Sequence, residues 1–290
     1  MPDSASLQQT LEAIAAQHHG DVALFAENLT TGQTVGIHAD EPVQTASVIK
    51  LAILYEAIQQ IRNGTAHFDD SIVMHSADQV PRSGVLLFFD TPMTLTLKDA
   101  LTMMIAMSDN TATNLVIDRL GLDRINDGIE KLGFKNTCLY RKVFRPAEGA
   151  VPEDHRRFGL GKTTPREMAE LMRRIVKCDL VEPGRPALPS DRELCERMLY
   201  MLRNQFYRGG IPRYLGHMYT DTDSAIANKT GELSTVRNDV AVIEAKQGTL
   251  ILSIFTCNNQ DQSWSVENEG ELTIAKLSKA IVAAWSPEDL

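Results

Sequence analysis

Thr45–Ala46–Ser47–Val48–Ile49–Lys50 is the stretch around which the sequence is organised, and the apolar run from Leu51 to Tyr55 follows it. This pattern predicts the first turn of a buried helix. Residues three apart share a helix face, so the Ser47 hydroxyl and the Lys50 ammonium would lie side by side. Backbone N–H groups at a helix N-terminus lack helical partners and can stabilise an oxyanion. The stretch therefore predicts a serine nucleophile with Lys50 as its base, although a capping serine before an ordinary helix has the same pattern.

Composition sets limits on the class of protein. The chain has 290 residues, 43% apolar and 23% charged, which is ordinary for a soluble globular protein with a substantial core. Its net charge of −9 argues against nucleic acid or an anionic membrane surface as a partner. A small anionic substrate stays compatible, because one local cationic pocket suffices to bind it. No apolar run approaches the roughly 18 residues of a membrane helix. We expect a monomer.

The four cysteines, Cys138, Cys178, Cys195 and Cys257, lie far apart and lack metal-ligand spacing. We expect them to be mostly buried thiols, and we expect neither a metal nor a cofactor. The N-terminus lacks the basic and apolar regions of a signal peptide. The sequence therefore leaves two compartments open: periplasmic or secreted if a signal peptide has been trimmed, and cytoplasmic if Met1 is the native start.

Hydrophobic periodicity predicts the order of the elements. Both ends of the chain combine helices with strands, whereas the middle is helical apart from a long loop over 141–162, and loops of that length are often functional. The order indicates a single domain over 1–290 with an α/β lobe from 1–64 and 215–290 and a helical lobe inserted over 65–214. The expected helices are 7–17, 47–63, 97–107, 112–120, 122–132, 164–176, 190–203 and 271–285; the expected strands are 22–26, 34–37, 225–229, 239–245 and 249–257.

Two further motifs change the reading of Ser47. Ser108–Asp109–Asn110 follows an apolar helix, where a tight polar turn would expose it, and Lys229–Thr230–Gly231 ends a strand. The Gly231 position lets a ligand approach the backbone closely. Ser-x-x-Lys, Ser-Asp-Asn and Lys-Thr-Gly in this order form the signature of class A β-lactamases and penicillin-binding proteins. Over nearly its whole length the chain resembles the class A serine β-lactamase family, as a divergent branch.

The resemblance implies a two-lobed fold, with an antiparallel sheet flanked by helices and an inserted all-α lobe. It also implies roles for particular residues. Ser47 would attack a strained amide carbonyl with Lys50 as base, and Ser108 would relay a proton to the leaving nitrogen. The remaining implied residues stabilise the oxyanion or bind substrate: Asn110, Lys229, Thr230, Gly231, Glu232 through its backbone N–H, and Arg237. For Arg237 a strand-end surface arginine is an equally good interpretation, and Asp109 is expected to bond its own turn.

The match weakens in the loop that should hold the deacylating base. Counted back from Thr163–Thr164–Pro165, Glu148 stands at about the position of the family's catalytic glutamate. Pro152 stands where the family has a water-holding asparagine, and it has no side-chain amide. A solvated loop acid is the alternative interpretation of Glu148, with Glu153 and Asp154 as further candidates for the base. Without a placed base, hydrolysis of the acyl-enzyme would be slow.

Three functions therefore remain open. The first is a serine β-lactamase that forms an acyl-enzyme on Ser47. The second is a D-alanyl-D-alanine peptidase or esterase that shares the three motifs. The third is a slow-turnover penicillin-binding protein or sensor. The residues expected for acylation are all present (Ser47, Lys50, Ser108 and Lys229), which disfavours this third function.

Overall fold

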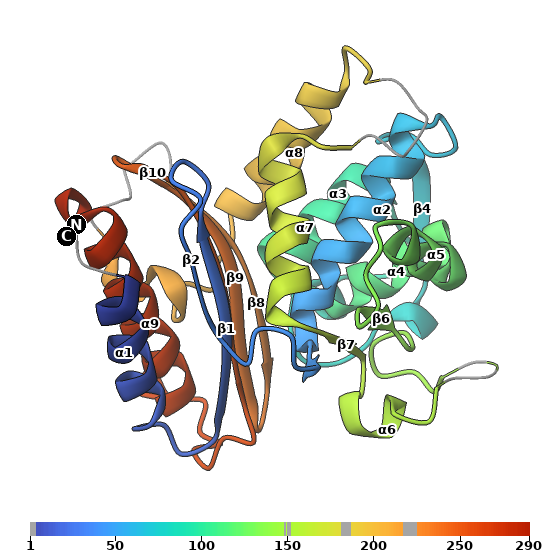
Figure 1. Ribbon diagram of the computed structural model, residues 1–290. Coiled ribbons are helices and arrows are strands. Elements are labelled where there is room, and N and C mark those ends of the chain that lie inside the picture. The colour runs from blue at the N-terminus through green and yellow to red at the C-terminus, as the bar shows by residue number, and fades with distance from the viewer. Residues whose placement is uncertain (1–3, 148, 150–151, 181–186, 217–224) are drawn as a thin grey trace. The chain divides into compact units, whose positions relative to one another are not determined.

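The computed structural model describes residues 4–147, 149, 152–180, 187–216 and 225–290, and the chain divides into two compact units (Figure 1). Unit 1 comprises Met1–Val48, Thr163–Arg173 and Tyr207–Leu290. Unit 2 comprises Ile49–Lys162 and Arg174–Phe206.

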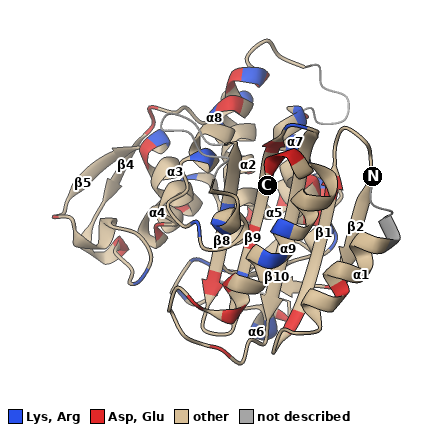
Figure 2. Cartoon of the chain, turned by 90° about the vertical axis from the view of Figure 1, so that its left-hand side faces the viewer, with Lys and Arg blue, Asp and Glu red and all other residues tan. Residues whose placement is uncertain are grey.

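Unit 1 is built on a five-stranded antiparallel sheet with the strand order β2-β1-β10-β9-β8. β9 and β10 are joined by the tight turn at Lys246–Gln247 and are rich in apolar residues, which suits strands in the middle of a sheet. Acidic and basic residues lie mainly on helices and connecting segments rather than on these strands (Figure 2). The strand bounds are β1 (Asp21–Asn28), β2 (Thr34–Ile37), β8 (Ile226–Leu233), β9 (Val236–Ala245) and β10 (Gly248–Cys257).

Helices α1 (Ser4–Ala15) and α9 (Glu269–Trp285) lie side by side on one face of this sheet (Figure 1). They bury apolar side chains against the strands, among them Leu11 and Ile281, both 0% exposed. The short 3₁₀ helix η4 (Ile211–Tyr214) packs on α9. The apolar side chains between these helices and the strands form the core of unit 1. Burial of apolar surface is the main favourable contribution to folding, so this core holds the helices on that face of the sheet. The unit also contains β3 (Val43–Gln44) and, at the C-terminus, η6 (Pro287–Asp289).

Unit 2 is organised around helix α2 (Lys50–Arg62), which is buried along nearly its whole length and contacts α3, α4, α5 and α8. α2 ends at Asn63, and the next residue, Gly64, adopts φ +72°, a conformation that favours glycine. The surrounding helices are α3 (Leu97–Ala106), α4 (Asn110–Leu120), α5 (Leu122–Lys131) and α8 (Asp191–Arg203).

Short elements complete unit 2. The strands β4 (Ser71–Met74) and β5 (Met93–Thr96) pair antiparallel, and β6 (Cys138–Leu139) pairs with β7 (Gly161–Thr163). The other elements are η2 (Ser76–Asp78), η3 (Leu86–Phe88) and α6 (His155–Phe158). Helix α7 (Pro165–Lys177) is divided between the units: its residues up to Arg173 belong to unit 1, and the remaining residues belong to unit 2.

The antiparallel sheet flanked by helices, together with a separate helical unit, confirms the predicted fold class, and most predicted helices and strands are confirmed within a few residues. Four features differ. Ser47 lies in a 3₁₀ turn, η1 (Ala46–Ile49), and the α-helix starts only at Lys50. The β4–β5 pair was missed, and the predicted loop over 141–162 contains α6 and most of β7. The sequence-based lobe boundary at residue 64 assigns α2 to the sheet lobe, whereas α2 belongs to unit 2 because it packs on helices there.

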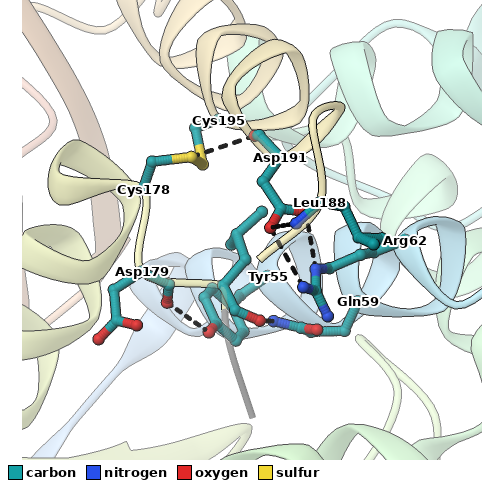
Figure 3. The surroundings of a disulfide bond; sticks show 9 residues. Tyr55, Gln59, Arg62, Cys178, Asp179, Leu188, Asp191 and Cys195 are labelled. Carbon is teal, nitrogen blue, oxygen red and sulfur yellow. Dashed lines mark hydrogen bonds and ion pairs between the residues drawn. A yellow bond between two sulfur atoms is a disulfide. The ribbon is translucent and has the colours of Figure 1, made fainter. Parts of the chain in front are cut away.

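The expectation of thiols is wrong for two of the four cysteines. Cys178, just after α7, and Cys195, within α8, form a disulfide with 2.14 Å between the Sγ atoms (Figure 3). Cys138 and Cys257 are not joined in a disulfide and are only partly buried. The 17-residue separation gave no pairing signal, because sequence alone does not show which helix ends lie together. In the described part of the chain, no helix combines the length and the apolarity needed to cross a membrane.

Candidate active site

In unit 1 the strand that carries the Lys-Thr-Gly motif lies directly against the turn that carries Ser47. A Cβ atom added to Gly231 on β8 would lie 2.7 Å from Thr45 O, 2.8 Å from Val48 N and 2.9 Å from Ser47 N. Backbone atoms cannot yield as a flexible side chain can, so only glycine permits this approach. The first and third sequence motifs therefore meet at the Ser47 backbone, whose N–H is the predicted oxyanion donor.

Asn238 fixes the same turn from β9. It stands opposite Gly231 in the β8–β9 register, and its Nδ2 donates to Gln44 O at 2.9 Å and to Thr45 O at 3.1 Å. The next residue, Ala46, adopts φ +45°, which is unfavourable for a residue with a Cβ. Such strain persists only where the surroundings enforce it, and here it orients Ser47. Sequence reasoning missed Asn238; the only signal was a polar residue at an interior strand position.

Lys229 is buried completely within unit 1. Its Nζ donates to Thr230 O at 2.8 Å. Burial lowers the pKa of Lys229 to about 7, while the negative charges of Glu232 and Asp239 act in the opposite direction. A lysine that titrates near neutral pH can both donate and accept a proton, which suits the predicted assistance to proton transfer. Thr230 is also buried, and Glu232 is partly exposed at the end of β8.

Asp239 is a second buried ionisable group in unit 1 that sequence reasoning did not assign. Its Oδ1 accepts from Asn228 Nδ2 at 3.0 Å, and its Oδ2 accepts from Ile211 N at 2.9 Å. Burial raises the pKa of Asp239 to about 7, although both hydrogen bonds oppose the shift. An acidic residue in the interior of a strand region was the available signal.

Arg237 is not a surface arginine, because its side chain is 1% exposed. The guanidinium donates from Nη1 to Val236 O at 2.9 Å and from Nη2 to Ser263 O at 2.7 Å. Its Nε lies 3.7 Å from Glu271 Oε1, and its Cζ lies 4.5 Å from the centroid of the Trp264 ring. These contacts bind the guanidinium to its own unit, so contact with a substrate carboxylate stays a prediction.

In unit 2 the helix that starts at Lys50 brings the first motif to the second. Lys50 is 0% exposed, and its Nζ donates to Ser108 O at 2.8 Å, Ser108 Oγ at 3.1 Å and Asn110 Oδ1 at 3.2 Å. Ser108 itself adopts φ +52°, a sharp turn between α3 and α4 that directs both its carbonyl and its hydroxyl to the lysine. The geometry joins an amine to a hydroxyl that could pass a proton onward.

Asp109 has the structural role expected for an acid in a tight turn. Its Oδ1 accepts from Ala112 N at 2.8 Å and so caps α4. Its Oδ2 accepts from Val85 N at 2.7 Å and from Leu86 N at 2.9 Å. The carboxylate thus holds the segment before α3 against the Ser108 turn and is not available as a base.

The predicted base Glu148 lies outside the described residues. Of the other acids proposed for that role, Asp154 accepts from Lys162 Nζ at 2.6 Å and from Tyr140 Oη at 2.9 Å. The hydrogen bond from Lys162 holds the pKa of Asp154 below its ordinary value. Glu153 is exposed to solvent. Asp154 is therefore a structural anchor of the loop.

Metal chemistry was not expected from the sequence. Among the residues that the structure describes, no group of three or more His, Cys, Asp or Glu side chains could hold a metal ion.

Comparison with known proteins gives a consistent picture. The family model described as "Beta-lactamase enzyme family" matches residues 6–285. The crystal structure of a β-lactamase from Sphaerobacter thermophilus is similar with a TM-score of 0.81 and 31% identity, and the match covers 97% of each chain. A β-lactamase of Rhodobacter capsulatus is 25% identical over 96% of this chain and 88% of its own length.

A third similarity concerns the fold alone. PBP-A, solved as a point mutant in an acyl-enzyme complex with penicillin-G, aligns over 100% of both chains with a TM-score of 0.79 at 22% identity. The match of the family model over nearly the whole length, the Sphaerobacter similarity and the arrangement of the three motifs agree. The chain therefore belongs to the β-lactamase enzyme family, whose members are hydrolases that act on β-lactams.

Proposed function

We propose that this protein opens the amide of β-lactams by forming an acyl-enzyme on Ser47. The observation that carries the proposal is the position of Lys50, whose buried Nζ donates to both Ser108 Oγ and Asn110 Oδ1. Only two residues separate Ser47 from Lys50 in one helical segment, so chain connectivity keeps the nucleophile near this amine. A buried amine that is hydrogen-bonded to a hydroxyl is suited to accept and return a proton.

The acylation step follows from these groups. Ser47 Oγ attacks the lactam carbonyl and gives its proton to Lys50, directly or through a water. The backbone N–H groups of Ser47 and Glu232 stabilise the developing oxyanion. Ser108 Oγ then donates a proton to the leaving nitrogen as the C–N bond breaks, and it is reprotonated from Lys50 or Lys229. The product of this half-reaction is an ester on Ser47, with the β-lactam ring opened.

Release of the acyl group needs a water and a base, and we assign the base to Glu148. If Glu148 does not act in this way, the ester persists and the protein behaves as a slow-turnover penicillin-binding protein. A D-alanyl-D-alanine peptidase or esterase would use the same acylation residues. What favours a β-lactam substrate is the name shared by the relatives from Amycolatopsis lactamdurans and Streptomyces cacaoi, 24% and 26% identical, together with the penicillin-G acyl-enzyme known for PBP-A.

The test is a pair of measurements on the full chain with a chromogenic cephalosporin. Stopped-flow absorbance follows ring opening, and intact-mass spectrometry detects an adduct. We expect wild type to be acylated and Ser47→Ala to lose both signals. Ser71→Ala, which removes an exposed hydroxyl at the start of β4, is the matched control and should behave as wild type. Undiminished ring opening by Ser47→Ala would refute the mechanism.

Glu148→Gln separates acylation from release. If Glu148 is the base, this variant forms the adduct at the wild-type rate but keeps it far longer. If the adduct lifetime is the same in both proteins, Glu148 is removed from the mechanism, while the assignment of Ser47 stands.

A further inference from the structure

His18, in the turn between α1 and β1, is a buried histidine that the proposed mechanism does not use. Its side chain is 0% exposed. Its Nε2 lies 3.0 Å from Asn259 Oδ1, and its Nδ1 lies 3.2 Å from Thr273 Oγ1 on α9. Both ring nitrogens therefore have polar partners inside unit 1, and the ring is held in one orientation.

The hydrogen bonds around Asn259 have directions that the chain itself determines. The Thr256 hydroxyl donates its one hydrogen to Arg237 O at 3.0 Å, so it can only accept from Asn259 Nδ2 at 2.9 Å. This arrangement turns Asn259 Oδ1 toward His18, and an amide oxygen can only accept. His18 Nε2 therefore carries a hydrogen, whether the ring is neutral or charged, and donates it to Asn259.

These hydrogen bonds lead from His18 to Arg237. Thr256 stands opposite Arg237 in the β9–β10 register, and its hydroxyl binds the carbonyl of that residue. The two linking side chains are buried, since Thr256 is 0% and Asn259 2% exposed. A Cβ atom added to Gly270 would lie 2.8 Å from Thr256 Oγ1 and 3.0 Å from Arg237 Cγ. The linking side chains thus pack beside both the backbone and the side-chain stem of Arg237.

Asn259 also fastens the two segments that adjoin Arg237. Its N donates to Thr235 O at 3.1 Å, in the turn between β8 and β9. It stands near the start of the segment 258–268 between β10 and α9, and the Ser263 carbonyl of that segment accepts from Arg237 Nη2 at 2.7 Å. Loosening Asn259 would therefore release the turn that precedes Arg237 and the segment that binds its guanidinium.

We propose that His18 is a positioning residue for Arg237 and keeps its guanidinium where it can bind the carboxylate of a β-lactam. The link runs through Asn259 and Thr256. This inference rests on the proposed function and on the substrate contact that the family resemblance implies for Arg237. Recognition of a carboxylate depends on the geometry of the guanidinium fork, and a small displacement far from the chemistry can cost much of the rate. His18 therefore matters for substrates that carry the carboxylate.

The test compares benzylpenicillin with its methyl ester, which lacks the free carboxylate. The second-order acylation rate constant is measured for each compound by stopped-flow absorbance and intact mass. The ratio of the two constants is the carboxylate preference. His18→Leu removes the donor to Asn259 and keeps an apolar side chain in the buried site. We expect this variant to lower the carboxylate preference about three- to tenfold, as for the loss of one buried hydrogen bond.

Conservative variants distinguish positioning from general support of the fold. His18→Gln keeps an N–H donor for Asn259 and should restore most of the carboxylate preference. Thr256→Val breaks the link at its other end and should lower the preference, whereas Thr256→Ser keeps the hydroxyl and should not. His19→Leu removes an exposed imidazole from the same turn and is the matched control, with an unchanged preference. Urea unfolding measures the stability of every variant, because a smaller folded fraction lowers both rates equally.

A double variant shows whether the effect passes through Arg237. Arg237→Gln alone should lower the carboxylate preference, and adding His18→Leu should lower it no further, because residues that act through one group are not additive. A further fall in the double variant would refute the inference. It is also refuted, while the proposed function stands, if His18→Leu and Thr256→Val change both rates by the same factor. If neither compound acylates wild type, the proposed function fails and this inference fails with it.

Discussion

The two ends of helix α2 each bury a cation, but they surround it differently. Lys50, the first residue of the helix, donates from Nζ to the carbonyl and hydroxyl of Ser108 and to the amide oxygen of Asn110. Arg62, the last residue, donates from Nε and Nη2 to the two carboxylate oxygens of Asp191 at 2.7 and 3.1 Å. These acceptors of Lys50 are neutral oxygens, whereas the acceptor at Arg62 is the carboxylate of Asp191, which carries a full negative charge.

The Arg62 end is further fastened to the chain that follows α7 (Figure 3). Tyr55 Oη donates to Asp179 O at 3.2 Å, and Gln59 Nε2 donates to Leu180 O at 3.0 Å. The Cys178–Cys195 disulfide closes the same region covalently. Burial would raise the pKa of Asp191, but the hydrogen bonds from Arg62 and from the Leu188 backbone N–H outweigh it and lower that pKa.

The different partners of Lys50 and Arg62 indicate different roles for the two ends of α2. A buried ion pair holds both charges in place, because removing either partner leaves the other charge buried without compensation. The Lys50 amine, in contrast, donates to the Ser108 hydroxyl, a group that can pass a proton onward. We infer that the Lys50 end is adapted to proton transfer and that the Arg62 end keeps the helix in place.

Replacement of the Lys50 amine should have the largest effect. Lys50→Met keeps an unbranched apolar stem and removes the base, so we expect acylation by a β-lactam to fall about 10³-fold or more, within the upper range for general-base catalysis. Stopped-flow absorbance measures the rate, and urea unfolding measures the stability of the same sample. If acylation falls only as far as the folded fraction falls, Lys50 is a structural residue and the contrast between the two ends disappears.

Breaking the ion pair at the other end should cost stability instead. Asp191→Ala leaves the Arg62 guanidinium buried without its carboxylate, and we expect the free energy of unfolding to fall by about 3 kcal/mol. The acylation rate, measured where the variant is still folded, should stay within about twofold of wild type. Glu193→Gln is the control, because it weakens the exposed i,i+4 pair with Arg197 and should cost about 0.3–0.5 kcal/mol. An equal cost for both variants would contradict the assignment.

Removing the disulfide should have a somewhat smaller effect of the same kind. The Cys178→Ser, Cys195→Ser double variant loses a cross-link between residues 17 apart, which corresponds to about 2–3 kcal/mol of unfolding free energy. Urea unfolding of wild type with and without a reductant gives the same quantity independently. If the double variant changes the acylation rate but not the stability, the disulfide supports the catalytic residues at the Lys50 end of α2. That outcome would contradict our interpretation.

Local sequence patterns predict many of the helices, strands and motifs of this protein. The apolar period over α3, the Thr164 cap and Pro165 start of α7, and the continuous strand pattern of β10 are legible because they involve neighbours in the chain. The three motifs are legible for the same reason, since each is a run of three or four residues. The β4–β5 pair escaped prediction because its two four-residue strands, unlike the equally short β2, are not joined to a neighbouring strand by a tight turn.

What the sequence by itself determined is the fold class, the order of most elements and the motifs whose residues we propose to carry the chemistry. Only the tertiary structure decided that Gly231 lies against the Ser47 backbone, that Asn238 holds that turn and that Cys178 pairs with Cys195. It likewise decided that Arg237 is buried rather than exposed. The physical reason is that these contacts join residues far apart in the chain. Their energy depends on which faces pack together, and no local period of the sequence records that choice.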